Sequence, residues 1–249
     1  MELERLFPPG DPVVPADLLA AERPWEKAPA DRPYVLANMI ATLDGRADID
    51  GGSTDLGGPA DQAMFGALRG SVDAVLAGTG TVATEGYGRL AAKAQRRRDR
   101  RALGLAGDPL MVLISRSGKV PWDAPLFEAE VQPVVVLTAP GKVTVPKGIA
   151  APVEVVELED LTNARALEVL RHDHGVRALL CEGGPKLLRA LLADQLLDEL
   201  CLTLDPLAAG GDDKRRILAG DELDEPARAE LLSVLRSDDE LLLRYRFGG

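Results

Sequence analysis

The sequence predicts an α/β protein with a mostly parallel sheet, flanked by helices and completed by an antiparallel C-terminal hairpin. First, apolar runs of strand length alternate with amphipathic stretches of helical period. Second, several of these runs are almost continuously apolar, which is typical of parallel strands that are covered on both faces. Third, residues 230–247 form two β-like runs around Ser237-Asp238-Asp239, a sequence that favours a tight turn.

Composition narrows the class of protein further. The chain has 249 residues, 46% apolar and 28% charged, with 29 Lys and Arg against 40 Asp and Glu, a net charge of −11. These values exclude fibrous and disordered classes, and the acidic balance argues against a broad surface for nucleic acid or anionic lipid. No apolar run reaches the roughly 20 residues of a membrane span, and the first residues do not form a signal peptide. Cys181 and Cys201 are expected to be buried reduced thiols, so we expect a cytoplasmic protein.

The N-terminal region differs from the rest in its proline content. Seven of the 18 prolines lie within the first 33 residues, and proline disfavours both helix interiors and central strands. We therefore expect residues 1–32 to form an extended arm. No internal linker follows, so residues 33–249 are expected to form one domain.

The periodic part of the chain begins at residue 34. A strand is predicted over residues 34–43, before the Asp44-Gly45 turn. A helix follows from Pro59 to about Arg69 and buries Ala60, Met64 and Leu68. Residues 90–104 contain an arginine-rich segment that favours a solvated helix. Further strands are expected at 73–77, 110–115, 133–138, 153–158, 176–181 and 198–204, with helices at 163–172 and from residue 185.

Three places where a predicted strand gives way to a turn or helix have the composition of a ligand site. Parallel sheets bind ligands at the carboxyl ends of their strands. Gly78-Thr79-Gly80-Thr81-Val82 follows the strand at 73–77, and Glu182-Gly183-Gly184-Pro185 opens a helix. Both can present backbone amides to a phosphate, although a plain turn or helix entry explains each equally simply. Ser115-Arg116-Ser117-Gly118 offers the cation and hydroxyls that an adenosine 2′-phosphate needs, or merely an exposed turn.

Other chemistries find little support. The Gly78 segment lacks the acidic residue about 20 positions on that a Rossmann dinucleotide site requires. His172 and His174 fit a helix end better than a metal site, and neither a zinc deaminase motif nor a G-x-S-x-G nucleophile motif occurs. We therefore expect no metal and an organic cofactor as the source of reactivity.

A set of motifs, taken together, resembles a known family. The chain is similar over about residues 33–247 to the reductase domain of the riboflavin-biosynthesis deaminase–reductase, in the dihydrofolate-reductase-like superfamily. The motifs are Thr42-Leu43-Asp44-Gly45-Arg46, Gly58-Pro59, Leu68-Arg69, DAVLAGTGTV at 73–82, Ile114-Ser115-Arg116-Ser117-Gly118, Cys181-Glu182-Gly183-Gly184-Pro185 and Leu197-Asp198-Glu199-Leu200.

The resemblance implies a dihydrofolate-reductase-like fold, NADPH as cofactor, a homodimer, and reduction of the ribosyl side chain of a 5-amino-6-ribosylaminopyrimidine phosphate to ribityl. It also implies roles for particular residues. The resemblance implies that Glu85 and Asp44 are the catalytic residues. The substrate is bound by Asn38, Ser53, Arg69 and Arg89, with Lys93 as another possible phosphate-binding cation. The cofactor is bound by Ala41, Gly78, Thr79, Gly80, Thr81, Val82, Ser115, Arg116, Glu182, Gly183, Gly184 and Pro185.

Three positions depart from the family pattern and leave the substrate open. Asn38 replaces a lysine, Glu85 replaces an aspartate, and Asp55 replaces an aromatic residue. The alternatives are a reductase of the same fold that acts on dihydrofolate or another pteridine-like molecule, and a nucleotide-binding module without turnover.

Overall fold

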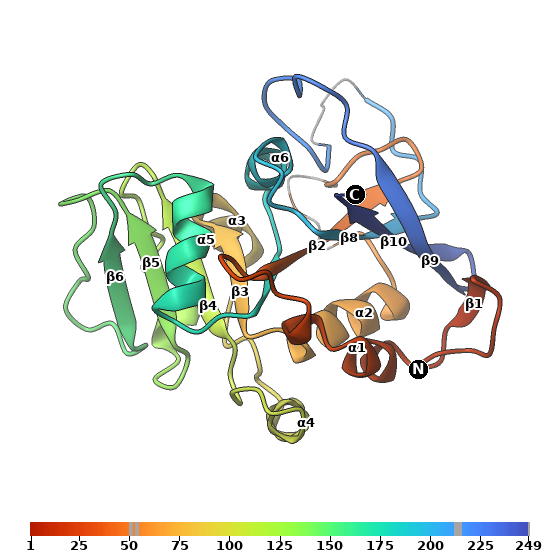
Figure 1. The fold of residues 1–249 in the computed structure, drawn as a ribbon, viewed down its shortest axis with the longest axis horizontal. Coiled ribbons are helices and arrows are strands. Elements are labelled where there is room, and N and C mark those ends of the chain that lie inside the picture. Colours follow the sequence, from red (N-terminus) through yellow and green to blue (C-terminus); the bar gives the residue numbers. More distant parts are fainter. Residues whose placement is uncertain (50–51, 53–54, 212–215, 249) are drawn as a thin grey trace. The chain divides into compact units, whose positions relative to one another are not determined.

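The computed structural model describes residues 1–49, 52, 55–211 and 216–248. The chain forms two compact units, each assembled from separate segments (Figure 1). The first unit comprises Met1–Glu22, Val35–Leu68 and Glu182–Gly249, and the second comprises Arg23–Tyr34 and Arg69–Cys181. Our expectation of a single domain across residues 33–249 stays a prediction.

The second unit is built on five parallel strands. Their order is β7 (Ala178–Cys181), β3 (Ala74–Gly78), β4 (Leu110–Ser115), β5 (Val134–Thr138) and β6 (Val153–Glu157). Almost every side chain of β3, β4 and β5 is buried, as the continuous apolar runs predict. The helices are α3 (Thr79–Glu85), α4 (Ala94–Ala102) and α5 (Asn163–His172), with 3₁₀ turns η1 (Pro24–Glu26) and η2 (Pro125–Glu128).

The first unit contains the antiparallel part of the structure. Its strand order is β1 (Glu4–Phe7), β9 (Ala229–Ser237), β10 (Glu240–Phe247), β8 (Glu199–Asp205) and β2 (Tyr34–Thr42), with β2 parallel to β8. The predicted C-terminal hairpin is confirmed, and Asp238 adopts the left-handed conformation (φ 52°) in its turn. The helices are α1 (Pro15–Glu22), α2 (Pro59–Gly70), whose last two residues belong to the second unit, and α6 (Pro185–Ala193). Ala60, Met64 and Leu68 of α2 are buried, as expected.

The expectation that residues 1–32 form an extended arm is wrong. This segment forms β1, α1 and η1, and it buries Leu3, Leu19 and Trp25. Its prolines are compatible with helix because Pro15 and Pro24 each stand at the first helical position, where no amide donor is needed. Strand β1 exists because it pairs with β9, more than 200 positions away along the chain.

An ion-pair network fixes the end of α1. The Arg244 side chain is 3% exposed and donates to Glu22 at 2.5 and 2.6 Å and to the fully buried Glu199 at 2.6 Å. A buried guanidinium needs such partners because desolvation of an unpaired charge is costly. The network therefore joins α1 to strands β8 and β10.

The arginine-rich helix α4 was expected to be solvated, but one of its arginines is buried. Arg100 of α4 is completely buried and donates to the backbone carbonyls of Arg69, Val72 and Ala106. Arg69 lies in the last turn of α2, where carbonyls lack partners within the helix and favour a cation. Burial lowers the pKa of Arg100 to about 10. Arg100 thus links α4 to the end of α2.

Candidate active site

The second unit brings two of the predicted cofactor segments together. Strands β3 and β4 are parallel neighbours, and Gly78 pairs in register with Ile114. Residues 79–82, which follow β3, and Arg116, which follows Ser115 at the end of β4, therefore leave the sheet at the same edge. This is where parallel α/β sheets bind ligands.

The first of these segments is the start of a helix rather than an irregular turn. Gly78 precedes α3 with extended dihedrals, and Thr79, Gly80, Thr81 and Val82 form the first turn of that helix. The side chain of Val82 is fully buried, so only its backbone can face a ligand. A Cβ atom at Gly80 would have no atom within 4 Å. The helix surface at Gly80 is therefore open to close approach by another molecule.

The second segment carries an exposed cation. The buried Ser115 hydroxyl donates to the Lys119 carbonyl at 2.8 Å. Arg116 donates from Nη2 to Oδ1 of Asn163, the first residue of α5, at 2.8 Å. Because Asn163 is neutral, this contact orients the guanidinium and leaves its charge available. This partner lies 47 residues further along the chain, so no local pattern of residues predicts the contact.

The predicted substrate residues of the second unit have different environments. The guanidinium of Arg69 lies over the ring of Tyr87, 5.3 Å from its centroid. Arg89 instead donates from Nε and Nη2 to the two carboxylate oxygens of Asp108, each at 2.7 Å. This bidentate pair neutralises Arg89, which makes it a poor phosphate ligand. Glu85 is half-buried at the end of α3.

Two predicted residues of the first unit lie on strand β2. Asn38 and Ala41 are three positions apart and therefore point to opposite faces of the strand. Ala41 is 4% exposed. The Oδ1 atom of Asn38 is buried and accepts no hydrogen bond from any described residue. A buried oxygen without a donor is costly to maintain, so Asn38 has the capacity to bind a ligand donor.

Asp44 follows β2 and has several donors. It accepts hydrogen bonds from the Thr42 hydroxyl at 2.6 Å and from the backbone amides of Ala209 and Gly210 at 3.2 and 2.7 Å. These donors, the Thr42 hydroxyl foremost, lower the pKa of Asp44 to about 2. Asp44 is therefore a carboxylate at neutral pH, able to hold the 209–210 backbone or a positive charge but without a proton to donate. Ser53, the remaining predicted residue, lies outside the described residues.

The predicted segment Glu182–Pro185 leads into α6. Gly183 has φ +97°, a conformation that favours glycine, and its peptide bond to Gly184 is cis. Gly184 is the N-cap residue of the helix and has extended backbone dihedrals, and Pro185 occupies the first turn. The predicted helix entry is thus confirmed, with its backbone set by glycine.

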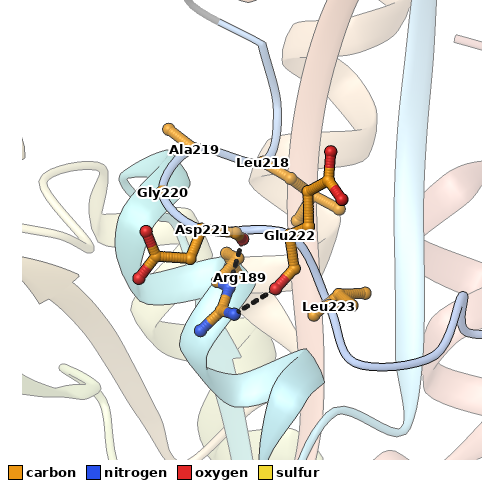
Figure 2. Close-up of a pocket in the computed structure, with 7 residues that line it drawn as sticks. All are labelled: Arg189, Leu218, Ala219, Gly220, Asp221, Glu222 and Leu223. Carbon is orange, nitrogen blue, oxygen red and sulfur yellow. Dashed lines mark hydrogen bonds between the residues drawn. The ribbon is translucent and has the colours of Figure 1, made fainter.

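A small pocket beside α6 is lined by none of the predicted site residues. Figure 2 shows Arg189 reaching across to the loop at 218–223, where it donates to the carbonyls of Asp221 and Glu222 at 3.0 and 2.7 Å. The amide of Ala219 donates to the Pro185 carbonyl. The volume, about 160 Å³, is below the roughly 300–1,000 Å³ of typical ligand sites. The contacts instead hold this loop against the first turns of α6.

The described residues contain neither a metal-binding cluster nor a membrane-spanning helix. No group of three or more His, Cys, Asp or Glu side chains is arranged to hold a metal ion. Cys181 and Cys201 are buried as reduced thiols, as predicted. No helix in this part of the chain is both long and apolar enough to cross a membrane.

The chain is similar to known reductases over most of its length. A family model described as the RibD C-terminal domain matches residues 33–243. The 2,5-diamino-6-ribosylamino-4(3H)-pyrimidinone 5′-phosphate reductase of Archaeoglobus fulgidus is 30% identical over 217 residues, 86% of this chain and 99% of the relative. The Methanothermobacter thermautotrophicus protein of the same name is 29% identical over 88% of this chain and 100% of its own length. The crystal structure of a pyrimidine reductase-like protein from Corynebacterium diphtheriae superposes with a TM-score of 0.77 at 22% identity, covering 95% of this chain and 100% of that one.

These findings confirm the predicted fold class. The protein has an α/β fold of the dihydrofolate-reductase-like type, with a mostly parallel sheet and an antiparallel C-terminal hairpin. The chain belongs to the RibD C-terminal domain family.

Proposed function

We propose that the chain is an NADPH-dependent reductase of a 5-amino-6-ribosylaminopyrimidine phosphate in riboflavin biosynthesis. The observation that carries this proposal is the match to two relatives named as reductases of the 2,5-diamino pyrimidinone 5′-phosphate, over almost their full lengths. A match of this extent covers the whole of each relative rather than a shared nucleotide-binding part.

The reaction sets clear requirements for the protein. The ribosylamine ring opens to an imine, the C1′ carbon of the imine gains a hydride, and its nitrogen gains a proton to give the ribitylamine. NADPH supplies the hydride when it is bound. The side chains must therefore orient the substrate, hold its phosphate and stabilise the positive charge of the iminium form.

The described residues fit a phosphorylated dinucleotide. The open surface at Gly80 allows a diphosphate to approach the backbone of α3, and the uncompensated charge of Arg116 suits a 2′-phosphate. We assign both segments, with Glu182–Pro185, to cofactor binding. Ser115 keeps the turn in place through its bond to the Lys119 carbonyl.

On the substrate side we assign charge stabilisation or proton transfer to Glu85 and phosphate binding to Arg69. Asn38 replaces the family lysine and offers a buried acceptor where the family has a donor, so we assign it to recognition of a donor on the substrate. Asp44 is assigned to positioning, since its carboxylate accepts bonds from the 209–210 backbone.

Steady-state oxidation of NADPH, followed by absorbance, tests the proposal. We expect turnover with the 2,5-diamino pyrimidinone phosphate or its deaminated counterpart, with the ribityl product identified by mass spectrometry. Dihydrofolate serves as the comparison substrate, and a higher kcat/KM with it would support the alternative reductase. Tight NADPH binding without turnover of any of the three would support the binding module and refute our proposal.

The oligomeric state and compartment follow from the same proposal. We expect a homodimer of a cytoplasmic enzyme that binds no nucleic acid, and analytical ultracentrifugation measures the first of these properties directly.

A further inference from the structure

The segment 206–211, which follows β8, is exposed at every residue and belongs to no helix or strand. No buried side chain anchors it, and a segment without apolar packing opens easily. Its backbone is nevertheless bound to the turn after β2, where the Leu43 amide donates to the Leu207 carbonyl at 2.7 Å. The Asp44 carboxylate of the same turn accepts from the Gly210 amide at 2.7 Å. Hydrogen bonds to one turn therefore hold a segment that packing does not.

Arg46 of this turn binds the same residue of the segment as Asp44 does. Asp44 accepts from the amide of Gly210, and Arg46 donates from Nη1 to its carbonyl at 3.0 Å. The Thr42 hydroxyl joins the two side chains to one turn, since it donates to Asp44 Oδ1 at 2.6 Å and accepts from the Arg46 amide at 2.9 Å. The Arg46 guanidinium also lies 4.0 Å from the Asp48 carboxylate. We call the two contacts with Gly210 the Asp44–Arg46 clamp.

The clamp acts on the residue type that is hardest to order. Gly210 and Gly211 have φ +67° and +88°. Glycine loses more conformational freedom on folding than any other residue, so a fixed glycine needs partners for its polar groups. Gly210 has a partner for both its amide and its carbonyl. The direction of the chain at this point therefore depends on Arg46 as well as on Asp44.

The clamp lies where two parallel strands of the first unit end. Strands β2 and β8 pair in register up to their last residues, so the segments that follow them leave the sheet at the same edge. Ligands of α/β sheets bind outside the carboxyl ends of parallel strands. Leu43 and Leu207 are 65% and 46% exposed there. The clamp thus holds an apolar surface at this edge, and small-molecule sites are lined largely by apolar side chains.

We propose that Arg46 is a positioning residue for the substrate. Together with Asp44 it fixes the segment 207–211, so that this segment forms one wall of the substrate site and presents Leu207 to the heterocycle. Arg46 acts through Gly210 and does not itself touch the reacting atoms. The inference rests on the proposed function for the identity of the substrate, but the clamp can be tested without it.

Hydrogen exchange of the full chain without ligand, followed by mass spectrometry, tests the clamp. Arg46→Met removes the donor but keeps an unbranched side chain, and loss of one charge-assisted contact should speed exchange in 207–211 about tenfold. Arg46→Lys keeps a donor and should restore part of the protection. Arg189→Met is the matched control, because Arg189 also donates to loop carbonyls, those of Asp221 and Glu222. Its effect should be confined to that loop.

Steady-state kinetics with the pyrimidine phosphate test the wall. Arg46→Met and Leu207→Ala should each lower kcat/KM for this substrate about tenfold, with the Kd of NADPH and the kcat/KM of Arg189→Met within about twofold of the wild type. Arg46→Met combined with Asp44→Asn should lose less than the product of the two single losses, because both residues act through Gly210. A residue that only stabilised the fold would lower the melting temperature and leave kcat/KM of the folded enzyme unchanged.

The outcomes separate this inference from the proposed function. Unchanged exchange in 207–211 of Arg46→Met would refute the clamp, whatever the activity. Faster exchange there with unchanged kcat/KM would refute the positioning role and leave the proposed function intact. If the wild type turns over none of the pyrimidines, the proposed function and the assignment of the wall to this substrate both fail, while the exchange result still decides the clamp.

Discussion

Replacement of Asn163 by aspartate should change the cofactor preference by exchanging only the side-chain amide nitrogen for oxygen. Asn163 Oδ1 accepts from Arg116 at 2.8 Å, and the residue is 4% exposed at the first position of α5. Aspartate has almost the same shape and is favoured electrostatically at a helix N-terminus, so we expect the fold to tolerate it. The new carboxylate would form an ion pair with Arg116 and cancel the charge assigned to the 2′-phosphate.

The magnitude follows from the contact that would be lost. A hydrogen bond to a charged group contributes about 1.5–3 kcal/mol. Arg116 is exposed, and solvent screening favours the lower end of that range, about 1.5 kcal/mol or roughly tenfold in kcat/KM. Asn163→Asp should therefore lower kcat/KM for NADPH about tenfold and change that for NADH by less than about twofold. Arg116→Ala should have the same selective effect.

The assay is the ratio of kcat/KM for NADPH to that for NADH, measured at low and high salt. Lys119→Gln is the matched control, because it removes a nearby exposed charge that we do not assign to the cofactor. An unchanged ratio in both Asn163→Asp and Arg116→Ala would refute the assignment of Arg116. An equal loss with both cofactors would mean that the α5 terminus had been distorted instead.

Three further predictions concern other parts of the chain. Glu85→Gln should lower kcat by about a hundredfold or more with NADPH affinity preserved, whereas a change below about twofold would reduce Glu85 to a surface turn residue. Gly183→Val should abolish NADPH binding in a titration, since the backbone at φ +97° strains any branched residue; an unchanged affinity would remove this segment from the cofactor site. Glu199→Gln should cost about 3 kcal/mol, the lower end for a broken buried pair because Glu22 still binds Arg244. The melting temperature should then fall by about 6–12 °C. Glu230→Gln, at an exposed pair, should shift it by less than about 2 °C.

Elements defined by local composition could be predicted from the sequence. Strands β4 and β5 are apolar up to their last residues, Ser115 and Thr138, because both faces are covered, and the pattern of α2 shows its buried face directly. The glycine-bearing segments at 78–82 and 182–185 were also visible, because what they provide is backbone conformation, which depends on residue type. Such features require no knowledge of distant residues.

Features that depend on distant partners could not be predicted. Strand β1 needs β9, and α1 is held by a bond between Glu22 and Arg244, 222 positions apart. Arg100 belongs to a segment that was predicted to be solvated, but it is buried against carbonyls of the α2 end. Arg89 was predicted to bind substrate, but it is paired with Asp108. Charge alone does not say whether an arginine is structural or available to a ligand.

The pKa of Asp44 also depends on distant residues, and the sequence alone does not predict it. The sequence suggests a catalytic carboxylate, but the Thr42 hydroxyl and the amides of Ala209 and Gly210 lower its pKa to about 2. The ordinary pKa of aspartate is about 3.9. Because the pKa of Asp44 is lower, its ionised, hydrogen-bonded form is fully present at any pH above that value and is lost only as the pH falls towards 2. Asp44 therefore does not titrate at neutral or mildly acidic pH, and an acidic limb in kcat above about pH 5 must come from another group. We expect Asp44→Asn to lower kcat by disturbing the 209–210 backbone, with the apparent pKa of that limb unchanged. A limb that disappears in Asp44→Asn would show that Asp44 is itself the titrating group and would refute this reasoning.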